Sequence, residues 1–155
     1  MRGCSDSWID AVAVLSVSDP EAKSNVLIAY DDAPAGQRAM NILDNVDHRL
    51  DEPMNWYPLL WRFDLLEDPE WRVLATADAL RADLLIIAAS SQSDLPASVQ
   101  DWIKDCLTQK HGTAAAVVAL LGSAENLDEP DSPRIQFIKS AAARAGLDFF
   151  APGVR

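Results

Sequence analysis

Two adjacent carboxylates are the side chains in this sequence that are best suited to chemistry. Asp31 and Asp32 directly follow a continuously apolar segment, residues 25–30. Paired carboxylate oxygens suit Mg²⁺, although a competent site needs further ligands or the phosphates of a substrate. The pair also has a structural interpretation, in which Asp32 caps the next helix and Asp31 is solvated. The sequence is compatible with both interpretations, so the pair is a candidate magnesium and ligand-binding site.

Two polar loops supply the remaining candidates for ligand binding. The first follows the apolar run 83–89, and the second follows the apolar run 114–121. The candidates in these loops are Ser90, Ser91, Gln92, Ser93, Gly122 and Ser123. Small side chains and free backbone N–H groups allow a flat ring or a phosphate to approach. Loops of this composition also serve simply to start helices.

No complete catalytic motif accompanies these residues. The sequence contains no Gly-x-Ser-x-Gly elbow, no phosphate-binding Gly-Lys-Ser/Thr loop and no Gly-x-Gly-x-x-Gly. Its two histidines, His48 and His111, lie near the ends of expected helices, where a His more often stabilises the helix dipole than catalyses. A hydrolase based on Ser90 or Ser91 would lack a nearby base. We therefore predict no catalytic residue.

Composition narrows the possible partners and the compartment. The chain has 155 residues and a formal net charge of −11, so its surface should repel nucleic acid and anionic membranes. Its two cysteines, Cys4 and Cys106, indicate neither a disulfide framework nor a zinc site and fit a reducing compartment. The apolar run at residues 8–17 is too short to span a bilayer. These features predict a cytoplasmic protein.

Four junctions mark the starts of the helices that must position the candidate residues. In each one an Asp or Ser shortly precedes a proline: Asp32-Ala33-Pro34, Asp68-Pro69, Asp94-Leu95-Pro96 and Ser132-Pro133. A side-chain acceptor at the N-cap and a proline in the first turn favour helix initiation. The expected helices cover residues 34–50, 69–81, 96–109 and 133–145. The second of them carries Trp71, Leu74 and Ala77.

Apolar segments between these helices predict the strands. The expected strands cover residues 25–30, 59–65, 83–89, 114–121 and 147–150. The second alternates between apolar and polar residues and has Pro58 at its start, which indicates an edge strand. Alternating strands and helices predict a three-layer α/β doubly wound sandwich with a five-stranded parallel sheet in the order 2-1-3-4-5. Residues 25–155 should form this single domain, and residues 1–24 an N-terminal extension of undetermined structure.

This layout resembles the flavodoxin-like fold, and within it the receiver domains of response regulators. Receivers carry an acidic pair after their first strand, which Asp31 and Asp32 match. Ser90 stands where receivers have the phosphoacceptor Asp, Ser123 matches their hydroxyl position, and residues 151–152 (Ala-Pro) replace their Lys-Pro. Because the phosphoacceptor and the Lys are missing, the resemblance implies a pseudo-receiver that is not phosphorylated on aspartate.

A second resemblance is to the flavodoxins themselves. The loop at residues 90–96, followed by Trp102, resembles a flavin-contacting loop of that family, and residues 122–126 lie where the family has its other such loop. The resemblance implies FMN in the crevice between the first and third strands. Flavodoxins bind the FMN phosphate in a Ser/Thr-rich loop after the first strand. This chain instead has two carboxylates there, and Pro34 offers no N–H donor.

Aromatic residues near the expected edge strand complete the list of candidates. Trp56, Tyr57 and Trp71 either pack locally or form an interaction surface, since aromatics are enriched at the centres of interfaces. We therefore expect a non-catalytic regulatory or protein-interaction module that binds a protein partner or a second copy of itself. The alternative is a diverged flavin-binding or small-ligand-binding protein. The sequence identifies neither the partner nor the oligomeric state.

Overall fold

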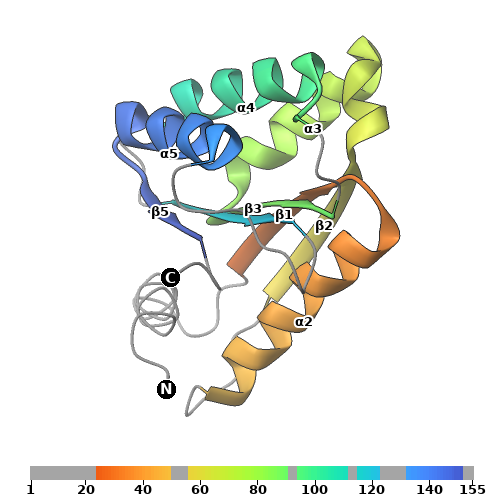
Figure 1. Ribbon diagram of the computed structural model, residues 1–155, viewed down its shortest axis with the longest axis vertical. Coiled ribbons are helices and arrows are strands. Elements are labelled where there is room, and N and C mark those ends of the chain that lie inside the picture. Colours follow the sequence, from red (N-terminus) through yellow and green to blue (C-terminus); the bar gives the residue numbers. More distant parts are fainter. Residues whose placement is uncertain (1–23, 50–55, 91–93, 112–114, 123–131, 152–155) are drawn as a thin grey trace.

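Five parallel strands form one sheet in the order β2-β1-β3-β4-β5 (Figure 1). The computed structural model describes residues 24–49, 56–90, 94–111, 115–122 and 132–151. The strands are β1 (Ser24–Tyr30), β2 (Trp56–Arg62), β3 (Leu84–Ala89), β4 (Ala116–Leu121) and β5 (Asp148–Phe150). The helices are α2 (Ala33–Arg49), the short 3-10 helix η2 (Phe63–Glu67), α3 (Pro69–Arg81), α4 (Ala97–Gln109) and α5 (Pro133–Ala145). The predicted flavodoxin-like fold is confirmed.

Helices cover both faces of the sheet, which explains the continuously apolar strands. Helices α3, α4 and α5 lie on one face and α2 lies on the other (Figure 1). Every residue of β3 and β4 is buried, as expected for parallel strands with helices on both faces. Within the central pair, Ile28 of β1 lies beside Ile86 of β3. Among the described residues, no helix is long and apolar enough to cross a bilayer.

The second strand is an edge strand, as predicted, but its predicted bounds were wrong. It covers Trp56–Arg62 rather than 59–65, so Pro58 lies inside the strand, beside Val26 of β1. An edge strand tolerates proline because its outer side has no ladder bonds to lose. The chain then turns into η2, where Phe63 and Leu66 are both buried. Phe63 and Leu66 are three positions apart, which is the repeat of a 3-10 helix. The alternating apolar pattern had instead predicted that Phe63 belongs to the strand.

Three of the four predicted helix starts use the expected side chain. The bonds run from Ala35 N to Asp32 Oδ1 at 3.1 Å, from Glu70 N to Asp68 Oδ1 at 3.0 Å and from Ile135 N to Ser132 Oγ at 3.2 Å. The prediction for Asp94 was wrong, because Pro96 occupies the N-cap of α4 and no side chain caps that helix. The helix therefore begins one residue later than expected, at Ala97, with Asp94 outside the cap position.

Candidate functional site

A crevice of about 250 Å³ opens at the carboxyl edge of the sheet, next to the ends of β1 and β3. This is the predicted switch point of the sheet, where ligands bind in doubly wound folds. The charged residues that line it are Asp31, Asp64, Glu67, Asp94 and Arg134. They come from the end of β1, from η2, from the segment before α4 and from the first turn of α5. The fold thus brings together residues that are far apart in the sequence.

The two carboxylates of the acidic pair have different roles in the structure. Asp31 Oδ1 accepts a hydrogen bond from the backbone N–H of Ser90 at 3.0 Å, which ties the end of β1 to the end of β3. Asp32 caps α2 through Ala35. Among the described residues, no group of three or more His, Cys, Asp or Glu side chains could hold a metal ion. Because Mg²⁺ is usually held by one or two carboxylates together with the phosphates of a substrate, the magnesium site at Asp31 and Asp32 stays a prediction.

Two of the polar-loop candidates, Ser90 and Gly122, lie at the carboxyl edge of the sheet. Gly122 follows β4, and its N–H donates to the carbonyl of Ala89 at 2.8 Å. Its own carbonyl accepts from the guanidinium of Arg38 on α2. Gly122 has φ 96°, a conformation that side-chain-bearing residues rarely adopt. The other candidates, Ser91, Gln92, Ser93 and Ser123, lie outside the described residues.

The charges that line the described part of the crevice do not favour the phosphate of FMN. Four carboxylates line it beside the guanidinium of Arg134, and like charges repel a phosphate dianion. Arg62 donates a hydrogen bond to Asp64 at 2.9 Å, which lowers the pKa of that carboxyl and places a positive charge beside it. Binding of FMN in this crevice stays a prediction.

The thiol of Cys106 has no place in a catalytic site. It lies on the inward face of α4, which consists of the predicted residues Val99, Trp102, Ile103, Cys106 and Leu107. Burial raises the pKa of Cys106 to about 12, while a hydrogen bond with Thr76 lowers it less strongly. The thiol therefore stays protonated at neutral pH and is a poor nucleophile.

A second candidate surface is the outward side of α3. Ala75 and Ala79 are the buried residues of this helix. Four larger apolar residues of this helix are exposed: Trp71 is 46% exposed, Val73 68%, Leu74 52% and Leu80 38%. Together with the exposed Ala77 they form what we call the α3 face. Sequence reasoning named Trp71, Leu74 and Ala77 on this helix but missed Val73 and Leu80.

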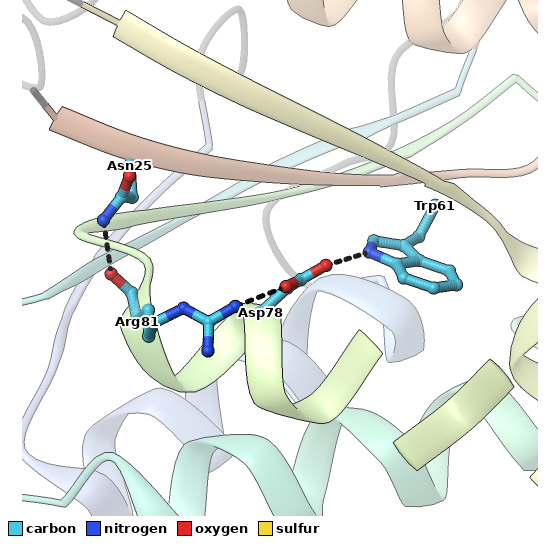
Figure 2. Close-up of polar contacts among 4 residues, drawn as sticks. All are labelled: Asn25, Trp61, Asp78 and Arg81. Atoms are coloured by element: carbon cyan, nitrogen blue, oxygen red, sulfur yellow. Dashed lines mark hydrogen bonds and ion pairs between the residues drawn. The ribbon is translucent and has the colours of Figure 1, made fainter. Parts of the chain in front are cut away.

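Polar contacts behind the α3 face hold the helix in place (Figure 2). Trp61 Nε1 of β2 donates to Asp78 Oδ2 at 3.0 Å, and Arg81 donates to Asp78 Oδ1 at 2.8 Å. Asn25 Nδ2 of β1 donates to the carbonyl of Arg81 at 3.2 Å. The Trp61 and Trp71 rings pack with their centroids 6.2 Å apart. The bonds from Trp61 and Asn25 join α3 to the sheet and so fix the rotation of the helix, whereas the Arg81–Asp78 pair lies within α3.

The other aromatic candidates, Trp56 and Tyr57, begin β2, and their side chains lie outside the described residues. On the opposite flank of α3 from Trp71, a groove of about 470 Å³ runs beside Val73, Arg72 and Thr76. Arg72 also lies 3.6 Å from Asp105 of α4, which links the two helices. The α3 face therefore has an aromatic on one side and a groove on the other.

Comparison with known proteins gives no family for this chain: no protein-family model and no curated protein matches it. The flavodoxin-like fold is assigned from the strand order and the arrangement of the helices.

Proposed function

We propose that this protein is a non-catalytic protein-interaction module that binds its partner through the α3 face. The observation that carries the proposal is the exposure of four large apolar side chains on one helix, at 38–68%. Burying such surface is worth about 25 cal/mol per Å², and clustered apolar surface of this kind marks interaction sites. A partner that covers the face would recover that free energy.

The rigidity of the surface also supports a binding role. Asp78 and Trp61 anchor α3 from behind, and the groove beside Val73 offers a depression for a side chain of the partner. A surface that is already ordered loses less entropy on binding. Trp71 is of the residue type most enriched among binding hot spots.

The regulatory part of the proposal rests on the receiver-like layout. Ser90 directly follows β3, where receivers carry the phosphoacceptor Asp, and Ala151 directly follows β5, in place of the receiver Lys. Because those two groups are missing, we propose that the domain acts by binding a partner rather than through phosphorylation on aspartate. No observation on the crevice favours the flavin-binding alternative over this one.

Affinity capture with matched baits tests the proposal. The baits are the full chain, a Val73→Lys variant and an Asp101→Lys control on the exposed side of α4. Val73 is 68% exposed, so the charge should block an apolar contact without unfolding the protein. We expect specific partners on the wild-type and control baits and not on the Val73→Lys bait. Equal capture by all three baits would refute binding through the α3 face.

A further inference from the structure

We infer that the α3 face binds a second copy of this chain, with the two α3 helices packed antiparallel about a twofold axis. This inference rests on the proposed function, because it names the partner of the same surface. A symmetric dimer requires a surface that complements itself when its direction is reversed. The distribution of charged and apolar residues along α3 meets this requirement.

The ends of the helix carry opposite charges on the same side. Glu70 lies in the first turn and Arg81 in the last. Arg81 lies eleven positions after Glu70, which is about three turns of helix, so both residues project in nearly the same direction. Both residues are exposed. Antiparallel packing places Glu70 of each copy beside Arg81 of the other, which creates two opposite-charge contacts in one interface.

The middle of the helix supplies the apolar centre of this interface. Val73, Leu74, Ala77 and Leu80 are exposed between the charged ends. Ala77 is small, so the two helix axes can approach to the roughly 8–10 Å that is usual for packed helices. Val73 and Leu80 are seven residues apart, about two turns, and share one flank of the helix. In the antiparallel arrangement, Leu80 of the second copy therefore lies beside Val73 of the first.

The groove accommodates that contact. It runs along the same flank, beside Arg72, Val73 and Thr76, so a Leu80 side chain of the second copy would enter it as a ridge enters a groove. The twofold axis repeats the contact, and each copy then supplies one ridge and one groove. Arg81 donates one hydrogen bond to Asp78 of the same helix (Figure 2) but is 67% exposed, so its remaining N–H groups can donate to Glu70 of the second copy.

A charge-reversal experiment tests this arrangement directly. Glu70→Lys alone places like charges opposite each other at both contacts, and so does Arg81→Glu alone. An equimolar mixture of the two variants restores an opposite-charge pair at both contacts of the mixed dimer. In sedimentation velocity over a micromolar to millimolar series, we expect each variant to raise the dimer Kd at least about tenfold. We expect the mixture to return to within about threefold of wild type.

Matched controls separate this effect from general charge effects. Asp101→Lys on α4 and Lys139→Glu on α5 make the same reversals on other exposed positions and should leave the Kd unchanged, singly and mixed. Circular dichroism melting confirms that every variant is folded. A wild-type chain that stays monomeric, or a mixture no tighter than its components, overturns the inference. If the wild-type chain is monomeric but captures partners that the Val73→Lys bait does not capture, the proposed function stands and only the identity of the partner is wrong.

Discussion

Lys110 shows how one buried charge ties two helices together. Its side chain is buried, and its Nζ donates to the carbonyls of Ala82 at 2.7 Å and Leu80 at 3.4 Å. Lys110 follows the last residue of α4, and its backbone N–H bonds to the carbonyl of Cys106. Its ammonium group, however, satisfies carbonyls at the end of α3. The residue therefore stabilises the helix that carries the proposed binding face.

Replacing Lys110 should destabilise the protein in a pH-dependent way. We expect Lys110→Met to lower the free energy of unfolding by about 1–3 kcal/mol near neutral pH, because buried carbonyls lose their donor. Burial lowers the pKa of Lys110 below its ordinary 10.5, partly offset by Asp83. Between the lowered pKa and 10.5 the unfolded chain binds more protons, so the contribution of Lys110 to stability rises with pH there.

Urea unfolding of wild type and Lys110→Met, measured in parallel from neutral pH to pH 10.5, checks both statements. The advantage of wild type over the variant should widen as the pH increases. A difference that stays constant or narrows over this range would show that burial does not lower the pKa in the native state.

At the scale of the elements, the helix starts give a matched test of capping. Ser132→Ala and Asp68→Ala each remove a side-chain bond to the first turn and should cost about 0.5–2 kcal/mol of unfolding free energy. Asp94→Ala should cost less than either, because no side chain caps α4. Chemical denaturation of the three variants measures this. An Asp94→Ala cost equal to that of Ser132→Ala would contradict the observed cap of α4.

The elements that sequence reasoning predicted best are those with local signals at both ends. Helix α5 matches its predicted bounds because Ser132 caps it, Pro133 fits its first turn and Gly146, at φ 75°, ends it. The course of β2 and η2 had no such signal. Phe63 fits the alternating apolar pattern of the strand, but it lies in η2 because its side chain packs in the core beneath the helices. Its conformation depends on neighbours that are distant in the sequence.

At the scale of the whole molecule, truncation tests the predicted domain boundary. Ala116, Val118 and Leu120 of β4 are at most 2% exposed, and they belong to one buried cluster with residues of β1, α2 and β3. Because residues 25–155 are predicted to form the domain, we expect deletion of residues 1–23 to leave the melting temperature essentially unchanged. Calorimetry of the full chain and of the truncated chain checks this, and a lower melting temperature after the deletion would contradict a boundary at residue 24.

The sequence by itself determined the fold, because helix caps and apolar periodicity act within a few residues along the chain. It also identified the acidic pair and the polar loops as neighbours at the sheet edge, since the ends of parallel strands share one edge. Only the tertiary structure showed that Asp31 bonds to Ser90 and that α3 turns Ala75 and Ala79 inward. Which side of a helix is buried depends on the volume available against the sheet, and small alanines let α3 approach closely. That packing leaves the larger apolar residues of α3 outside, where we propose that they bind.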